Sequence, residues 1–250
     1  MSQLIDNLNI IESVKTDIKS AIENKGVDMT GVSFPGYASK IGEISGGGGW
    51  DQKSITEGTT IITNLDNSAS FVASNAFNGN ITIQTVNLPY ATNVGNSAFY
   101  RCFSLTQVNL PVCSYIGNNA FNYCNSLLQV NLPMCSRIEG GGFGQCYSLS
   151  QISIPVCSYI GNNAFRFCSS LSQVSLPMCS YIDLYAFWGC SSLSIITIGY
   201  SGVCSLPYDA FNGTQITSST GSIYVPASLV DSYKSAPIWS VYSSRIFPIE

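Results

Sequence analysis

The sequence of 250 residues predicts a solenoid of short parallel strands joined by turns or short helices. First, phenylalanine recurs every 22 residues from Phe77 to Phe187. Second, each period contains an L-x-x-V-x-L-type pattern, and such a pattern at a period of about 20–29 residues is typical of leucine-rich-repeat solenoids. Third, residues 58–212 hold only seven of the 24 charged residues, whereas residues 1–57 hold 13. We therefore expect a leucine-rich-repeat solenoid preceded by a small α-helical segment.

One repeat unit, starting at Leu105, reads L-x-Q-V-x-L-P-x-C-S-Y-I-G-N-x-A-F-x-x-C-x-S. The apolar residues of 108–110 alternate with a polar one, which predicts a short strand with one buried face. A proline follows, at the end of the strand where its missing N–H does least damage. Ile116 predicts a second short strand, and Phe121 should fill the core from a turn or short helix. A single unit cannot bury its apolar face alone, so neighbouring units must stack.

The ten cysteines keep the same period and invite two interpretations. They form two columns plus Cys204: Cys102, Cys124, Cys146, Cys168 and Cys190, then Cys113, Cys135, Cys157 and Cys179. Five cysteines in one column cannot all pair, and a free cysteine behaves as a small hydrophobe. We therefore favour buried free thiols. Disulfides between rungs about 5 Å apart are the alternative, and the lack of any C-x-x-C pattern disfavours a metal site.

The two ends of the chain depart from the repeat. Residues 1–45 predict a helical segment for attachment or oligomerisation, and residues 46–49 form a glycine linker. The helix would carry an apolar stripe that packs on a partner or on its own copies, with a trimer favoured: Leu4, Leu8, Ile11, Ile18 and Ile22. Alternatively, it folds back over the first turn of the solenoid. The solenoid spans residues 50–226, and residues 227–250 are expected to cap its exposed end.

Outward-facing columns of the repeat provide the candidate binding residues. Aromatic rings and arginines on a surface with few charges suit stacking on a glycan or a protein hot spot, although the rings could simply shield the solenoid. The candidates are Tyr100, Arg101, Tyr115, Tyr123, Arg137, Tyr147, Tyr159, Arg166, Phe167, Tyr181 and Trp188. Two further columns, of glutamine and of asparagine or serine, are expected mainly to form structural ladders. Reading sugar hydroxyls is the alternative for those columns.

The composition disfavours an enzyme. The chain has no histidine, which excludes Ser-His-Asp and Cys-His sites and histidine-ligated metals, so we expect no cofactor and no metal. Glu139 and Asp183 share one repeat column two rungs, about 10 Å, apart. Inverting glycosidases separate their carboxyl groups by about 6.5–9.5 Å. Glycines at the same position on other rungs, including Gly117 and Gly161, instead predict a turn exposed to water, where both acids only add solubility.

Charge and hydropathy disfavour several partners. The net charge of −4 and the lack of a basic run give no support for nucleic-acid binding. No apolar stretch approaches the roughly 20 residues that span a bilayer, so we expect no membrane insertion. The first residues also lack the basic and apolar regions of a signal peptide.

The unit L-P-x-C-S-Y-I-G-N-x-A-F-x-x-C-x-S-L closely resembles the BspA-type leucine-rich repeats over about residues 70–226. The ending VPASLVDSYKSAPIWSVYSSRI is similar to the segment that often follows these repeats. The resemblance implies a surface adhesin or interaction protein.

The run IKSAIENKGVDMTGVSFPGYASKIGEISGGGG is similar to N-terminal segments of bacteriophage tail-fibre and minor structural proteins. This resemblance implies a non-enzymatic tail protein assembled in the host cytoplasm. Its first segment would bind other virion proteins, and its solenoid would bind a host-surface protein or glycan. The alternatives are a purely structural tail component that packs against other virion proteins, and a bacterial surface adhesin.

Overall fold

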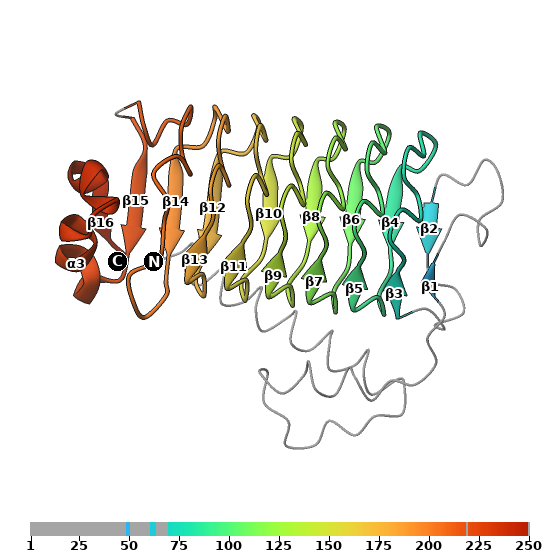
Figure 1. Cartoon of the computed structure of the whole chain (residues 1–250), viewed down its shortest axis with the longest axis horizontal. Helices are drawn as coiled ribbons and strands as arrows, with labels where there is room; N and C mark the ends of the chain where they lie inside the picture. Colours follow the sequence, from blue (N-terminus) through green and yellow to red (C-terminus); the bar gives the residue numbers. More distant parts are fainter. Residues whose placement is uncertain (1–48, 51–60, 64–69, 219, 250) are drawn as a thin grey trace, which may run out of the picture.

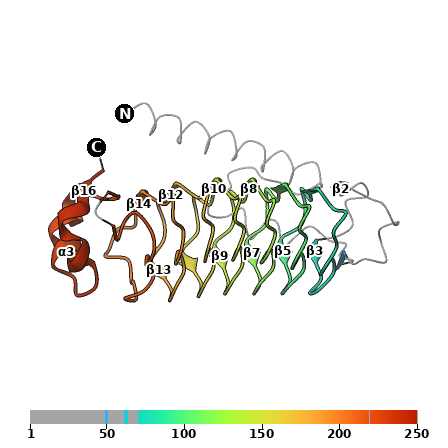
Figure 2. The same ribbon diagram turned by 90° about the horizontal axis from the view of Figure 1, so that it is seen from above.

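The computed structural model describes residues 49–50, 61–63, 70–218 and 220–249. Short parallel strands stack along one long axis in two rows, and a helical cap closes the C-terminal end (Figure 1). Figure 2 shows the same stack of rungs from above. The predicted leucine-rich-repeat solenoid with a period of about 22 residues is confirmed. The helix predicted over residues 1–45 and most of the glycine linker lie outside the described residues.

One row is a parallel sheet of seven strands. In each strand with a described side-chain burial, the first residue points outward and the second points into the core. The strands are β1 (Gly49–Trp50), β3 (Phe71–Val72), β5 (Asn93–Val94), β7 (Tyr115–Ile116), β9 (Arg137–Ile138), β11 (Tyr159–Ile160) and β13 (Tyr181–Ile182). Neighbours pair in register at a spacing of 22 residues, so Ile116 lies beside Ile138. The predicted second strand of each unit is therefore confirmed.

The other row consists of two sheets. The first sheet comprises β2 (Ile61–Thr63), β4 (Thr85–Asn87), β6 (Gln107–Asn109), β8 (Gln129–Asn131) and β10 (Gln151–Ser153). The second comprises β12 (Gln173–Leu176), β14 (Ile195–Ile198), β15 (Ser222–Val225) and β16 (Ile246–Pro248). Among the described strands, no ladder joins β10 to β12, and Ile152 of β10 is only half-buried. The first row continues through β9, β11 and β13, so the stack itself is not interrupted.

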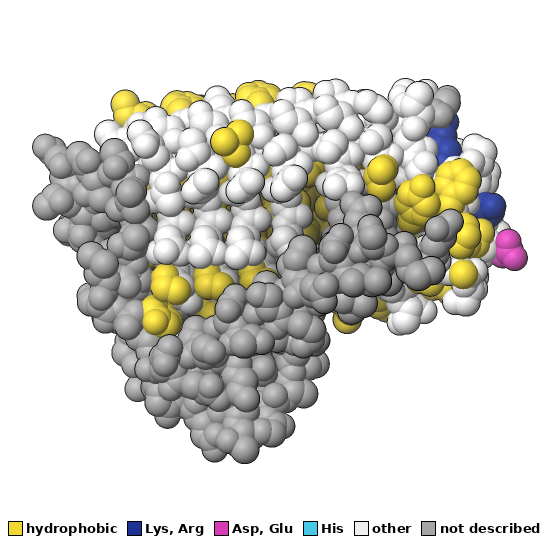
Figure 3. All heavy atoms as spheres, turned by 180° about the vertical axis from the view of Figure 1, so that it is seen from behind, with side chains coloured by type: hydrophobic (Ala, Val, Ile, Leu, Met, Phe, Trp, Pro, Cys, Tyr) yellow, Lys and Arg dark blue, Asp and Glu magenta, His cyan; other side chains and the backbone are white. Residues whose placement is uncertain are grey.

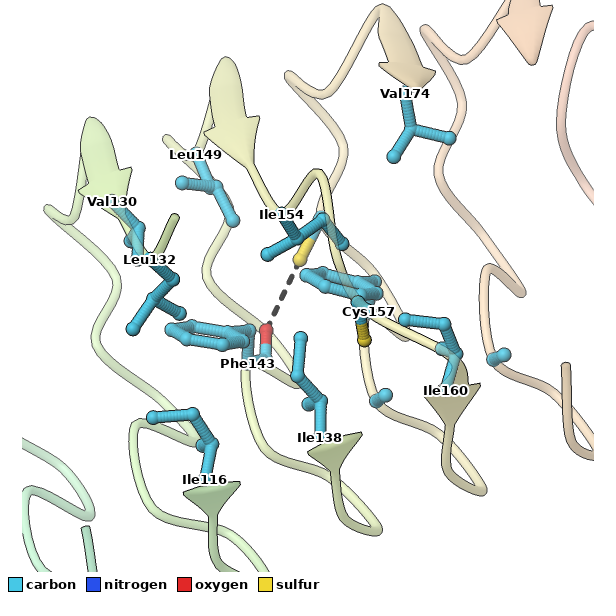
Figure 4. Packing of buried hydrophobic residues seen from close by; sticks show 14 of the residues in the cluster. Ile116, Val130, Leu132, Ile138, Phe143, Leu149, Ile154, Cys157, Ile160 and Val174 are labelled. Carbon is cyan, nitrogen blue, oxygen red and sulfur yellow. Dashed lines mark hydrogen bonds between the residues drawn. The ribbon is translucent and has the colours of Figure 1, made fainter. Parts of the chain in front are cut away.

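The core is a stack of equivalent side chains from successive rungs. The phenylalanine rings from Phe77 to Phe211 stack with centroids 4.9–5.8 Å apart. Figure 4 shows Phe143 among isoleucines contributed by neighbouring rungs. In the described repeats, the segment that carries each phenylalanine is a turn rather than a short helix. Each rung therefore buries its apolar face on the next, as stacked repeats require.

All ten cysteines are buried and free, so the interpretation as packed thiols is confirmed. In the first column each Sγ donates to a phenylalanine carbonyl of the preceding rung, as Cys168 does to Phe143 at 3.1 Å (dashed line in Figure 4). Burial raises the pKa of Cys102 and of Cys113 to about 12. These thiols therefore remain protonated and unreactive at neutral pH.

One expectation about the repeat was wrong. The column that contains Gly117 and Gly161 is not an open turn, because both glycines are buried. A Cβ atom at Gly161 would come within 2.8 Å of the backbone of Glu139, and one at Gly117 within 2.8 Å of the backbone nitrogen of Asn96. These glycines are needed because successive rungs approach closely here.

Short helices and one strand follow β15 at the C-terminal end of the solenoid. The short helices η3 (Ala227–Leu229), α3 (Val230–Ser235) and η4 (Trp239–Arg245) follow β15 and precede β16. Tyr233 is fully buried, and its hydroxyl accepts from the N–H of Cys204 at 2.9 Å. The indole of Trp239 donates to the carbonyl of Cys204 at 2.7 Å. The sequence analysis did not predict β16, which adds an edge strand beside β15.

Candidate functional site

The turns that contain the core phenylalanines form one side of the solenoid. We call residues 97–103, 119–125, 141–147, 163–169 and 185–191 the turn side. Seven of the predicted binding residues lie here: Tyr100, Arg101, Tyr123, Tyr147, Arg166, Phe167 and Trp188. The other four lie in the outward column of the seven-stranded sheet: Tyr115, Arg137, Tyr159 and Tyr181, which we call the strand column.

Each turn contains two residues with left-handed backbone conformation. At the first position φ is 54–66°, and the residues are Asn75, Ser97, Asn119, Gly141, Asn163 and Tyr185. At the second position φ is 57–75°, and the residues are Gly79, Arg101, Tyr123, Gln145, Phe167, Gly189 and Gly213. Asparagine and glycine tolerate this conformation, which explains four of the six residues at the first position but not Ser97 and Tyr185. The second position is glycine at both ends of the solenoid and bulky in the middle.

The bulky residues at the second position are costly for the fold. A left-handed conformation costs a residue other than glycine about 1–2 kcal/mol. Backbone conformation alone would therefore favour glycine on every rung. Strain of this kind is concentrated at functional sites in proteins. The side chains of Arg101, Tyr123, Gln145 and Phe167 must contribute something that offsets it.

Arg101 forms one cluster with two tyrosines, which we call the Arg101 cluster. Its guanidinium carbon lies 5.1 Å from the ring centroid of Tyr100 and 5.6 Å from that of Tyr123. The two rings meet edge to face, 5.7 Å apart. Cation–π contacts of this kind hold the arginine against the rings. The side chain of Arg101 itself is exposed.

A second cluster, the Arg166 cluster, comprises Arg166, Phe167, Tyr185 and Trp188. The guanidinium carbon of Arg166 lies 4.2 Å from the centroid of Trp188 and 4.9 Å from that of Phe167. Trp188 also packs 5.8 Å from Tyr185. A Cβ atom at Gly189 would overlap the ring of Phe167, so this glycine makes room for the cluster.

Tyr147 lies on the rung between the two clusters. Its side chain is exposed by 41%, and its hydroxyl donates to Oε1 of Gln145 at 3.0 Å. Sequence reasoning missed Tyr185, Gln145 and Gly189. A signal for them is present in the sequence: equivalent turn positions, 22 residues apart, hold glycine in some repeats and bulky residues in others.

The strand column is engaged in contacts within the protein. Arg137 donates to Glu139 at 2.5 Å and lies 3.7 Å from the ring centroid of Tyr159. Tyr159 stacks on Tyr181 with centroids 5.3 Å apart, and its hydroxyl donates to Asp183 at 3.2 Å. The charge of Arg137 is therefore already paired.

The carboxylates of Glu139 and Asp183 also affect the pKa of two tyrosines in the strand column. Burial raises the pKa of Tyr115 and of Tyr159, and the nearby Glu139 and Asp183 respectively raise it further. These phenols therefore remain protonated at neutral pH and serve as hydrogen-bond donors.

With the fold and these clusters described, comparison with known proteins becomes informative. The family described as the BspA type leucine rich repeat region matches residues 58–156 and 114–230, in six copies. The chain belongs to this family. The match begins at residue 58, so it gives no support to the likeness of residues 1–49 to phage proteins. No curated protein matches the chain.

Three solved structures are similar to this BspA-type chain. A leucine rich cell surface protein from Faecalibacterium prausnitzii is 20% identical, with 70% of this chain and 65% of that chain covered and a TM-score of 0.44. A leucine rich repeat protein of T. pallidum is 24% identical, with coverages of 55% and 58% and a TM-score of 0.38. One from Bacteroides ovatus is 17% identical, with coverages of 68% and 64% and a TM-score of 0.36. The chain spans less than two thirds of each.

The polar columns of these BspA-type repeats differ from each other. Asn131 donates to Asn109 at 2.7 Å, and Asn109 donates to Asn87 at 2.8 Å, so the asparagines form the expected ladder. The neighbouring glutamines, such as Gln107 and Gln129, are exposed and make no such ladder in the part of the chain that the structure describes.

The two candidate acids are committed to neighbouring residues of the BspA-type fold. Glu139 holds Arg137, while Asp183 accepts from the hydroxyl of Tyr159 and from the N–H of Leu184. Within the described ranges, no group of three or more acidic or thiol side chains could hold a metal ion. No helix of the same ranges is long and apolar enough to cross a bilayer.

Proposed function

We propose that this BspA-type repeat protein is a non-enzymatic binding protein that contacts a glycan or protein of another cell through its turn side. The observation that carries the proposal is the presence of large side chains at the second left-handed position of the turns. Four consecutive rungs there carry Arg101, Tyr123, Gln145 and Phe167, although glycine occupies the same position at Gly79 and Gly213. Residues of these types are typical anchors of binding surfaces.

The turn side suits a partner better than the strand column does. Arg137 of the strand column is paired with Glu139. Arg101 and Arg166 have no ion pair among the described residues. Contact along several rungs, each about 4.8 Å from the next, would give many weak equivalent interactions. Binding through an extended side needs no deep pocket.

We propose the bacterial cell surface as the location. The likeness to BspA-type repeats covers most of the chain and implies a surface adhesin. The second candidate is a tail-associated virion protein that binds the host or packs only on other virion proteins. It is supported by the likeness of residues 1–49 alone, as are their proposed roles in attachment and trimerisation. Antibody labelling of intact producing cells and of purified virions distinguishes the two locations.

Binding by the turn side is tested with two matched variants. The labelled full chain is applied to a panel of epithelial and bacterial cells and to a glycan array. Tyr123→Ala with Trp188→Ala should weaken binding at least roughly tenfold, as expected for aromatic hot spots. The control, Tyr159→Ala with Tyr181→Ala, removes two rings from the strand column and should change binding by less than about twofold. Equal loss in both variants, or none in either, contradicts the proposal.

A further inference from the structure

Resting on this proposed function, we propose that the turn side recognises an acidic polysaccharide, whose carboxylate or sulfate groups are bound by Arg101 and Arg166. Three features of the turn side favour such a ligand: the distribution of charge, the geometry of the two arginines and the polar atoms between them.

The charges of the solenoid are few and unevenly distributed. Residues 70–218 contain three cations, Arg101, Arg137 and Arg166, and Glu139 neutralises Arg137. Arg101 and Arg166 lie on the turn side, and none of its five turns contains an aspartate or a glutamate. Asp209 lies one rung beyond Tyr185 and accepts from the side chain of Asn212 at 2.7 Å. The turn side is therefore locally positive, although the chain as a whole carries −4.

The surface view agrees with this uneven distribution. On the face in Figure 3, visible charged side chains of the described residues gather at the end that carries the C-terminal cap. Elsewhere on that face, the visible described residues show no charged side chains.

Both guanidinium groups lie against aromatic rings; Arg101 is exposed, whereas Arg166 is half-buried and its Nε is buried. Arg166 lies against Phe167 and Trp188, and Arg101 lies against Tyr100 and Tyr123. A guanidinium group held in this way still presents N–H donors in its own plane, in the geometry that matches a carboxylate or sulfate. In the described part of the chain, neither guanidinium donates a hydrogen bond to a protein acceptor.

Unpartnered polar atoms occur on the same side. Among the described residues, three buried side-chain atoms lack a hydrogen-bond partner: Nε of Arg166, Oδ1 of Asn122 and Oδ1 of Asn163. All three belong to the turn side. Buried polar atoms in proteins normally have a partner. One donor and two acceptors without a partner in the protein suit a ligand that carries both anionic groups and hydroxyls and that reaches into these turns.

The spacing of the arginines favours a polymer. Arg101 and Arg166 are on rungs three apart, and at about 4.8 Å per rung this separation is about 14 Å along the axis. A chain with charges at regular intervals can engage both arginines at once, which raises its apparent affinity. The aromatic rings and amides between them match the C–H faces and hydroxyls of sugars. We therefore favour a polysaccharide over an acidic peptide.

The test compares charged and neutral forms of one polymer. Binding of the full chain is measured with polygalacturonate, carboxyl-reduced polygalacturonate, heparin and poly-L-glutamate. Polygalacturonate or heparin should bind at least roughly tenfold more tightly than the reduced polymer, and added salt should weaken this binding. Arg101→Gln with Arg166→Gln should remove the difference. The control, Lys234→Gln with Arg245→Gln, removes the same charge from the cap and should change binding by less than about twofold.

Each contrary outcome has a separate meaning. If the reduced polymer binds as tightly as polygalacturonate, or neither acidic polymer binds, the inference about acidic ligands is wrong. If poly-L-glutamate binds most tightly, the ligand is an acidic peptide and the polysaccharide assignment is wrong. An equal effect of the two charge variants also overturns it. Failure of the proposed function is recognised separately, because cell binding would then survive loss of Tyr123 and Trp188.

Discussion

The strain at the second left-handed position can be measured directly at Gln145. Its φ is 57°, and its side chain makes one hydrogen bond, with the hydroxyl of Tyr147. We predict that Gln145→Gly stabilises the protein relative to Gln145→Ala. Most comparisons of this kind go the other way, because glycine gains more freedom than alanine on unfolding.

The expected magnitude follows from two opposing terms. Alanine at this φ retains a left-handed cost of about 1–2 kcal/mol, which glycine does not have. Glycine loses about 0.4–1 kcal/mol through the greater entropy of the unfolded chain. Both variants lose the hydrogen bond to Tyr147, so that loss cancels. The glycine variant should therefore be more stable than the alanine variant by about 0.8 kcal/mol, the middle of a range of about 0–1.6 kcal/mol.

Equilibrium unfolding of the full chain in urea, followed by circular dichroism, gives the two free energies of unfolding. Leu128→Gly against Leu128→Ala provides the control at an exposed residue outside the left-handed positions, and there alanine should be the more stable. If Gln145→Ala equals or exceeds Gln145→Gly in stability, the backbone of Gln145 is not strained. The main argument for the turn side as a binding surface would then be lost.

Two further predictions concern the cap and the core. Tyr233→Phe removes the hydroxyl that accepts from the buried N–H of Cys204, so it should lower the free energy of unfolding by about 1–3 kcal/mol in a urea titration. In the same titration, Tyr208→Phe at an exposed residue is the control and should lower it by less than about 0.5 kcal/mol. Burial raises the pKa of Cys102 and Cys113 from 9.0 to about 12, so the folded state binds these protons more tightly. Stability should thus be unaffected by these thiols below pH 9 and fall between pH 9 and 12, and an unchanged urea midpoint across that range would contradict their burial.

Most of the fold could be predicted because apolar burial repeats with a fixed period. Val108 and Ile116 face the core for the same reason on every rung, and a spacing of 22 residues places each beside its equivalent. The cap could be predicted in outline, because a terminal rung has to be covered. The edge strand β16 was missed, because a three-residue strand that ends in a proline has no periodic signal of its own.

The candidate site was less predictable, because residue types do not reveal which contacts they make. Arg137 and Arg166 each lie against an aromatic ring that is 22 residues further along the chain. Only Arg137 is also paired with a carboxylate, that of Glu139 two residues away. The buried glycines illustrate the same limit. Gly161 could be read as a solvent-exposed turn from the sequence, and only the approach of the neighbouring rung shows that it has to lack a side chain.

In a repeat protein, equivalent positions of different repeats can be compared within one structure, and the left-handed positions of the turns can be compared in this way. Gly79 and Gly213 show what the backbone prefers at the second position, because they occupy equivalent places in one structure. Arg101 and Phe167 depart from that preference on rungs with the same backbone conformation. Packing of the core does not require these two side chains, since the phenylalanines of the glycine rungs, Phe77, Phe187 and Phe211, also stack on their neighbours, with centroids 4.9–5.8 Å apart. We therefore propose that the departure reflects what these side chains offer at the surface, which is aromatic area and positive charge without an ion pair.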